Sequence, residues 1–384
     1  MTGPEVSDGV PEEAYVAVLA GLSGMGPRRL RALLSHHVPS EAHAVVGGSA
    51  PPHPSVQRLL DSRRSGVHLG STWRAEVARV DPAEVWSRCV RAGVMVVPYG
   101  SARYPTALLH DPVPPAVLFV RGDLTVLDRR RVGVIGTRNA TRNGIATAEA
   151  LGADLAAAGV TVVSGLASGI DGAAHRGAVR ASGSPAAVVG NGPDRAYPRQ
   201  HGQLWEEVAA LGVLMSEWPP GVAPDAFRFP MRNRILAALS EVLVVVESRE
   251  RGGSLLTVRE AADRSVTVMA VPGSPRSRSS AGTNQLLCDG VAPVTCTDDI
   301  LMALGLDTRR AGRAAFDPRP APLGLEVAVL ARCRRDPCTI DHVVDELGVT
   351  VAEAAMALAR LERSGWLGES GGWFEVLEPW AMVP

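Results

Sequence analysis

Residues 227–234 place three arginines close to an aromatic ring. Arg228, Arg232 and Arg234 flank Phe229 in the segment FRFPMRNR. Guanidinium groups bind phosphates bidentately, and aromatic rings stack on nucleic-acid bases. The segment is therefore typical of a surface that binds single-stranded nucleic acid. The alternative is that its phenylalanines belong to the core, which is the commoner location of phenylalanine.

Two glycine-containing segments could add phosphate contacts. In GTRN, Gly136 permits close approach of the backbone to a ligand, and Arg138 follows with a guanidinium group. In SGLASGIDG, Ser164 offers a hydroxyl, and Gly169 precedes a helix that we expect to begin near Ile170. Free N–H groups at a helix N-terminus bind anions. Both segments also have a structural explanation, because arginine can pair with a carboxylate and a tight turn can require glycine.

The sequence lacks the usual catalytic arrangements. Asp171 and His175 lie one helical turn apart and could form an acid–base pair, although such a pair more often holds the start of a helix in place. All 39 basic residues are arginine, which excludes a Walker A lysine and a Schiff-base lysine. Gly133, Gly136 and Gly144 lack the spacing of a dinucleotide-binding fingerprint, and no Gly-x-Ser-x-Gly sequence stands at a nucleophile elbow between a predicted strand and a helix. We therefore expect no catalytic residue and no cofactor.

The loops that carry these residues follow apolar runs between residues 85 and 308. Apolar runs alternate there with helical patterns, which predicts an α/β domain with a parallel sheet and helices on both faces. Ligands of such sheets bind outside the carboxyl ends of the strands. Five or six donor-rich loops along one rim fit a ligand with several phosphates in a row. The expected strands are 132–136, 160–165, 186–190, 213–217, 241–247 and 266–273, with edge strands at 94–98 and 116–122.

Composition limits the classes of binding partner and the cellular compartments that fit this protein. The net charge is −1, so a nucleic-acid partner would need basic residues gathered locally. The five cysteines form no Cys-x-x-Cys pair, which predicts no metal site and reduced, mostly buried thiols in a cytoplasmic protein. No apolar run approaches the ~20 residues of a membrane span, and the N-terminus lacks the apolar core of a signal peptide.

The flanking regions predict two smaller domains. Residues 1–84 read as a helical domain, in which LSGMGPRRLRALL (22–34) resembles a helix-hairpin-helix that could contact phosphate through backbone amides. A structural cap similar to a sterile alpha motif (SAM) explains that segment equally well. Residues 309–322 are rich in Arg, Pro and Ala and are predicted to be a linker.

Residues 323–384 show three helical patterns followed by a hairpin, which is the order of a winged helix. In its third helix Glu353 and Glu362 offset Arg360 and Arg363, whereas a helix that reads a DNA groove would normally be more basic. We therefore favour a protein contact or a regulatory role for this domain over base reading.

Eight motifs between Tyr104 and residue 290 occur in the order of a known family. They are VGVIGTRNATRNG, VVSGLASGIDGAAHRGAV, AYPRQH, SEWPPG, FRFPMRNRILAALS, VVVES, GGSLLT and PGSPRSRSSAGTNQLL. Together they resemble the DNA-processing protein A (DprA/Smf) family. The resemblance implies an extended Rossmann-like domain that binds single-stranded DNA without catalysis. It also implies a homodimer that protects incoming strands and loads the RecA recombinase in natural transformation or recombination.

The resemblance and the loops together define an expected DNA-binding set. Departures from the family pattern lie at Asn191 and Pro193, at Gly252 and in the segment DGV (289–291). The expected set is Gly136, Arg138, Ser164, Gly165, Gly169, Arg228, Phe229, Arg232, Asn233, Arg234, Ser254, Thr257 and Asn284.

Two other functions remain open at this point. One is a nucleotide or phosphoribosyl hydrolase of the lysine-decarboxylase-like Rossmann fold, although ERGGSLLT and PGSPRSRSSAGTN lack the Gly-Thr-x-x-Glu spacing typical of those enzymes. The other is a transcription regulator built around residues 323–384, which would bind specific duplex DNA.

Overall fold

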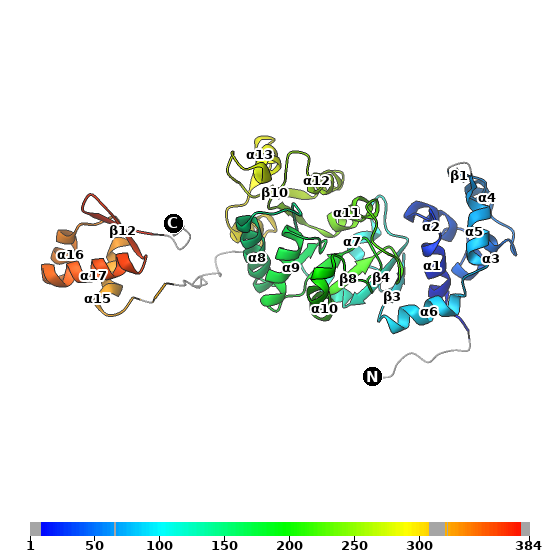
Figure 1. Ribbon diagram of the computed structural model, residues 1–384, viewed down its shortest axis with the longest axis horizontal. Helices are drawn as coiled ribbons and strands as arrows, with labels where there is room; N and C mark the ends of the chain where they lie inside the picture. Colours follow the sequence, from blue (N-terminus) through cyan, green and yellow to red (C-terminus); the bar gives the residue numbers. More distant parts are fainter. Residues whose placement is uncertain (1–8, 65–66, 307–318, 321, 378–384) are drawn as a thin grey trace. The chain divides into compact units, whose positions relative to one another are not determined.

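The computed structural model describes residues 9–64, 67–306, 319–320 and 322–377. The chain divides into two compact units, residues 1–308 and 309–384, and each is described here by itself (Figure 1). Most of the expected linker, residues 309–318 and 321, lies outside the described residues.

The first unit begins with six helices. Proline occupies the first turn of α2, α3, α4 and α6, where its missing N–H has no helical partner to lose. Leu33 and Trp73 are fully buried, and they share one apolar core with Phe119 of the neighbouring sheet. The elements are α1 (Glu12–Gly21), α2 (Pro27–Leu34), α3 (Pro39–Gly47), α4 (Pro54–Leu60), β1 (Arg63–Arg64), β2 (Val67–His68), α5 (Leu69–Val77) and α6 (Pro82–Arg91).

A nine-stranded sheet follows, in the order β11-β10-β9-β5-β6-β7-β8-β4-β3. All pairs from β11 to β8 are parallel, whereas β4 pairs antiparallel with β8 and with β3. The sequence-based prediction of a parallel α/β sheet is confirmed. The strands are β3 (Met95–Pro98), β4 (Val117–Gly122), β5 (Arg131–Ile135), β6 (Thr161–Ser164), β7 (Ala186–Val188), β8 (Val213–Ser216), β9 (Val242–Val245), β10 (Thr267–Ala270) and β11 (Ala292–Pro293).

Helices connect and cover these strands. Three further apolar clusters lie against the sheet: one around Val163 and Leu236, one around Val162 and Leu155, and one around Leu214 and Trp205. The connecting elements are α7 (Thr106–Leu109), η1 (Leu124–Asp128), α8 (Arg142–Ala157), α9 (Ile170–Arg180), η2 (Arg199–His201), α10 (Gly202–Leu211), α11 (Arg228–Leu239), α12 (Ser254–Ala262), η3 (Arg278–Ser280), α13 (Ala281–Cys288) and α14 (Thr297–Ala303).

The strand order reverses between β5 and β9. From β5 the chain adds β6, β7 and β8 on one side, and β9, β10 and β11 lie on the other. Loops that leave two neighbouring parallel strands in opposite directions open a crevice at the carboxyl ends of those strands. The loops after β5 and β9 should therefore border a ligand site.

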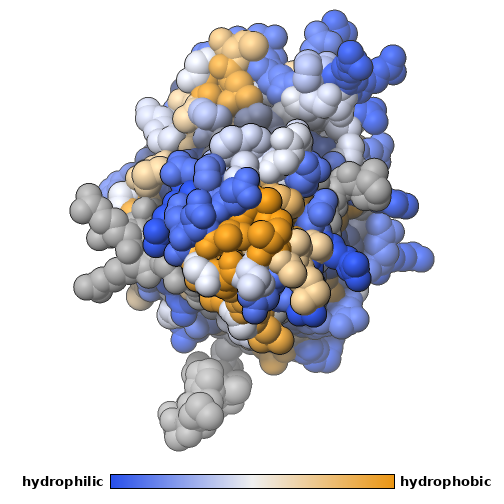
Figure 2. All heavy atoms as spheres, turned by 90° about the vertical axis from the view of Figure 1, so that its left-hand side faces the viewer, coloured by the Kyte–Doolittle hydropathy of each residue, from blue (hydrophilic) through white to orange (hydrophobic). Residues whose placement is uncertain are grey.

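The second unit contains three helices and a hairpin, in the order that the sequence predicts. Its core includes Leu358, Trp366 and the thiols of Cys333 and Cys338, whose sulfurs lie 2.9 Å apart. Several apolar residues of the unit are exposed, among them Val327 and Met356. Figure 2 shows an apolar area bordered by hydrophilic residues on the face that it presents. The elements are α15 (Leu325–Cys333), α16 (Ile340–Leu347), α17 (Val351–Arg363), β12 (Leu367–Ser370) and β13 (Trp373–Val376).

Among the described residues, no helix combines the length and the apolar character that crossing a membrane requires.

Candidate nucleic-acid interface

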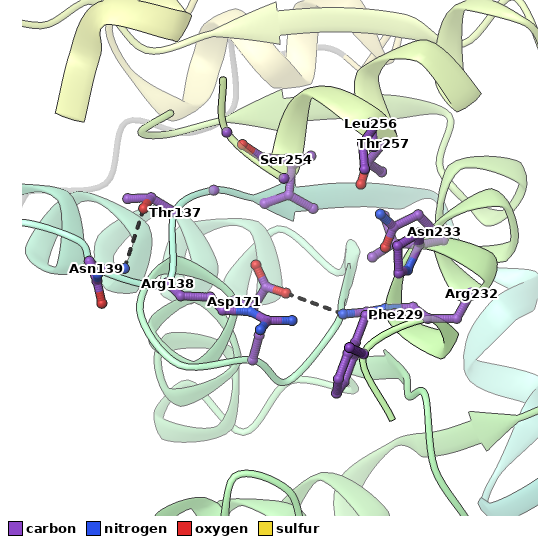
Figure 3. A pocket seen from close by; sticks show the side chains of 18 of the residues that line it. Thr137, Arg138, Asn139, Asp171, Phe229, Arg232, Asn233, Ser254, Leu256 and Thr257 are labelled. Carbon is purple, nitrogen blue, oxygen red and sulfur yellow. Dashed lines mark hydrogen bonds and ion pairs between the residues drawn. The ribbon is translucent and has the colours of Figure 1, made fainter. Parts of the chain in front are cut away.

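A cavity of about 580 Å³ lies at the reversal point of the strand order. We call it the switch-point cavity. The loop after β5, the segment from β9 into α12 and the first turns of α9 and α11 form part of its wall (Figure 3). Ala167 after β6, Tyr197 after β7 and residues 224–226 complete it. Residues of the expected set that line it are Gly136, Arg138, Phe229, Arg232, Asn233, Ser254 and Thr257.

Arg138 stands free in this cavity. Its side chain is exposed, and within the described part of the chain it makes no hydrogen bond or ion pair. Its guanidinium carbon lies 4.8 Å from the centre of the Phe229 ring, a cation–π distance. Phe229 in turn stacks on Tyr197, with ring centres 5.5 Å apart and an interplanar angle of 29°. A cation and two rings thus form a ladder along one wall.

Arg232 also lines the cavity, but it is a structural residue. It is only 4% exposed, and its guanidinium group donates to the carbonyls of Gly165 after β6 (3.2 Å) and Val188 at the end of β7. Its Nη2 lies 3.7 Å from Oδ2 of Asp171 on α9. Burial lowers the pKa of Arg232, and the negative charge of Asp171 opposes that shift. Arg232 therefore joins β6, β7 and α9 at the floor of the site.

Arg234 is not available to a ligand, which corrects the prediction. It is buried, and its Nη2 lies 2.6 Å from Oε1 of the buried Glu217. The helical period of α11 explains the difference. Phe229 and Asn233 are four residues apart and share the face toward the cavity, whereas Arg234 lies one residue further round the helix.

Two of the predicted polar contacts are also wrong, because their donors already have partners. Ser164 is fully buried, and its hydroxyl donates to the carbonyl of Val134 at 2.6 Å. The amide of Asn284 exchanges two hydrogen bonds with the backbone of Gly273, at 2.9 and 3.1 Å, and does not line the cavity. Asn284 thus links α13 to the segment after β10.

Ser254 and Thr257 line the cavity from α12, although both are buried. The Ser254 hydroxyl donates to the hydroxyl of Ser248 at 2.8 Å. Among the described residues, no hydrogen bond involves the side chain of Thr257 or that of Asn233 on α11. These two groups therefore remain candidate ligand donors.

The start of α9 offers fewer free amides than we predicted. Gly169 adopts a φ of 80°, and a side chain there would overlap the carbonyl of Thr137. That same carbonyl accepts the N–H of Ile170 at 3.3 Å, so the loop after β5 occupies the helix end. Gly165 does not line the switch-point cavity; it borders a smaller cavity of about 60 Å³ that shares Arg138 and Phe229.

Asp171 and His175 do not form an acid–base pair. Asp171 faces Arg232, and burial raises its pKa while Arg232 opposes the rise. His175 is fully buried, and burial lowers its pKa to about 3, which keeps its ring neutral. Neither group is an exposed proton donor or acceptor at the cavity.

Sequence reasoning missed two arginines. Arg249 and Arg251 are exposed and line the cavity from the loop after β9, and their side chains have no hydrogen-bond or ion-pair partner in the described part of the chain. Their position directly after a predicted strand was the available signal. With Arg138 they give the rim three unpaired cations, against one exposed carboxylate at Asp225.

The chain matches proteins that process DNA. A family model described as DNA recombination-mediator protein A matches residues 95–305. DNA processing protein DprA of Bacillus subtilis is 39% identical over 213 residues, which cover 55% of this chain and 72% of that protein. Protein Smf of Escherichia coli is 35% identical over 283 residues, 72% of this chain and 76% of that protein.

Two solved structures extend the likeness. DprA of Streptococcus pneumoniae superposes with a TM-score of 0.63 at 27% identity and covers 76% of this chain and 96% of its own. DNA processing protein A of Helicobacter pylori, described as having a unique single-stranded DNA binding mode, gives a TM-score of 0.50 at 27% identity. It covers 56% of this chain and 97% of its own.

Proposed function

Because the chain belongs to the DNA recombination-mediator protein A family, we propose that the switch-point cavity binds single-stranded DNA without chemical change. The observation that carries the proposal is the ladder of Arg138, Phe229 and Tyr197 beside the unpaired Arg249 and Arg251. Phosphates would meet the guanidinium groups while bases stack on the rings, which favours no particular base. The protein from H. pylori, which binds single-stranded DNA, supports this choice.

A single strand fits the cavity better than a duplex. Phe229 and Tyr197 lie in the wall of a concave site, and a base can reach such rings only when it is unstacked and unpaired. A duplex presents its bases edge-on and would meet only the exposed arginines. We therefore expect duplex binding to be weaker.

The proposal includes no catalytic step. His175 is buried and neutral, and Asp171 is paired with Arg232, so the cavity gains no proton-transfer pair from them. The resemblance to the family further suggests protection of incoming strands, loading of the RecA recombinase, a homodimer and a cytoplasmic location. These four properties belong to the proposal and extend beyond the site itself.

Titration of fluorescent oligonucleotides tests the proposal. Fluorescence anisotropy should show binding of a single-stranded oligonucleotide that is tighter than binding of the matching duplex. Arg138→Ala should weaken the affinity for every sequence alike, by about ten- to hundredfold, because it removes a charge-assisted hydrogen-bond donor.

The matched control is Arg91→Ala, which removes an exposed arginine of α6 that does not line the switch-point cavity. Equal affinity for the two kinds of DNA, or equal effects of the two substitutions, would contradict the proposal.

A further inference from the structure

A second cavity lies on the other side of the first turn of α11. It measures about 350 Å³ and is bordered by the α1–α2 turn, the segment after β8 and the start of α11. We call it the hairpin cavity. Neighbouring residues of one chain segment separate the two cavities: Ala226 and Phe229 line the switch-point cavity, whereas Phe227, Arg228 and Met231 line the hairpin cavity.

At the start of α11, one guanidinium group lies over two aromatic rings. The guanidinium carbon of Arg228 lies 5.2 Å from the centre of the Phe227 ring and 5.7 Å from that of Trp218. Phe227 is 53% exposed, which is unusual for a residue of its size and leaves one side of the ring without a partner. Arg228 donates to the carbonyl of Ala223, which fixes its direction. This arrangement resembles the ladder in the switch-point cavity.

The opposite wall is the turn that sequence analysis identified as a helix-hairpin-helix. Gly24 and Gly26 line the cavity, and within the described residues their backbone N–H groups donate to no acceptor. Arg29 also lines the cavity, and its Nη1 donates to the carbonyl of Gly24 at 2.6 Å. Two free amides and one guanidinium group provide the donors that a phosphate requires.

Acidic residues near this cavity are already engaged. Glu217 lines it, but its carboxylate is buried and forms an ion pair with Arg234 at 2.6 Å. Glu76 accepts the N–H of Ser23 at 2.8 Å, which leaves Gly24 and Gly26 as the open part of the turn. A phosphate at those glycines would therefore meet more positive than negative charge.

We infer that the hairpin cavity binds a further nucleotide of the same DNA strand. A base would stack on Phe227, and its phosphate would lie at the turn formed by Gly24, Gly26 and Arg29. Arg228 would lie between the two bound segments of the strand. This inference rests on the proposed function, because the strand must first occupy the switch-point cavity. It gives the α1–α2 turn a role in DNA binding.

Oligonucleotide length separates the two sites. A single strand of about 6 nucleotides should fill the switch-point cavity alone, and one of about 16 nucleotides should reach both cavities. Phe227→Ala should weaken binding of the longer strand by about tenfold and leave the shorter one unchanged, because it removes the ring on which a base stacks. Phe227→Tyr, which keeps the ring, should restore the affinity for the longer strand.

The control is Leu211→Ala, a truncation of an exposed apolar residue of α10 that borders neither cavity. Unchanged binding of the longer strand by Phe227→Ala would overturn the inference, and so would an equal loss of affinity for both lengths. Failure of the unsubstituted protein to bind the shorter strand, or an unchanged affinity for that strand in Arg138→Ala, would instead contradict the proposed function.

Discussion

The guanidinium group of Arg232 fills the space that a side chain at Gly165 would occupy. The arginine thus takes the place of a packed side chain beneath the switch-point cavity, and it carries a charge that Asp171 balances. Two arginines that line the same cavity therefore have different tasks. Arg232 holds the loops together, whereas Arg138 is free to meet a ligand.

The first prediction separates these tasks. Arg232→Ala should lower the free energy of unfolding by about 3 kcal/mol, because it leaves the carboxylate of Asp171 buried without its cation. Arg138→Ala should change it by less than about 0.5 kcal/mol, since the side chain is exposed and unpaired. Urea denaturation measures both. Similar stability losses in the two variants would show that the assignment is wrong.

The second prediction concerns salt. Replacing Arg249 and Arg251 together with alanine should make the slope of log K against log salt less steep by about 1.4, or about 0.7 for each phosphate of a single strand that is no longer neutralised. Anisotropy titrations at several salt concentrations give the slope. Arg91→Ala should leave the slope unchanged. An unchanged slope in the double variant would show that neither Arg249 nor Arg251 contacts the DNA.

The third prediction concerns the ring of Phe229. Phe229→Leu keeps an apolar side chain but removes the stacking surface and the partner of Arg138 and Tyr197. We expect binding of single-stranded DNA to weaken by about 1–3 kcal/mol. Phe229→Tyr should bind nearly as well as the original protein. If the leucine variant bound as well, stacking at this position would not contribute to affinity.

The fourth prediction concerns pH and His175. Its pKa is about 3 in the folded protein and about 6.5 in an unfolded chain, so between these values only the unfolded state binds the proton. Stability that is present above pH 6.5 is therefore lost as the pH falls. At pH 5 this loss should reach about 2 kcal/mol.

A His175→Gln variant lacks this titration. Its free energy of unfolding, measured in urea at pH 7 and pH 5, should fall less than that of the original protein. An identical fall in both proteins would show that His175 does not titrate as described.

The fifth prediction concerns the thiols. Cys288 and Cys296 are exposed, whereas Cys89, Cys333 and Cys338 are buried. Burial raises the pKa of Cys89 to about 11 and that of Cys333 to about 12, which suppresses the reactive thiolate. A thiol reagent such as DTNB should therefore label the exposed pair quickly and the others only after denaturation. Rapid labelling of every cysteine in the native protein would contradict the structure.

The strands were predictable because an apolar run of four or more residues reports burial directly. The runs at 132–136 and 241–247 became β5 and β9 with shifts of a residue or two at their ends. β11 has only two residues, Ala292 and Pro293, which is too short for any pattern. The antiparallel pairing of β3 and β4 could not be predicted either, because an apolar stretch of sequence does not indicate the direction of the neighbouring strand.

The candidate site was predictable at the level of loops, because parallel strands bring their carboxyl ends to one edge. The individual donors were less predictable. Three predicted residues have polar groups suited to DNA, but these groups already form hydrogen bonds within the protein. The pairs are Ser164 with Val134, Arg234 with Glu217, and Asn284 with Gly273. Those partners lie 30, 17 and 11 residues away along the chain, so residue type alone did not reveal them.

The first turn of α11 forms one wall shared by the two cavities. A helical turn is stiff, so a displacement of Phe229 by a ligand also moves Phe227 on the far side. Where occupation of one cavity alters the affinity of the other, linkage requires the same factor in both directions. The two bound parts of a strand would then be coupled energetically through a chain segment only a few residues long.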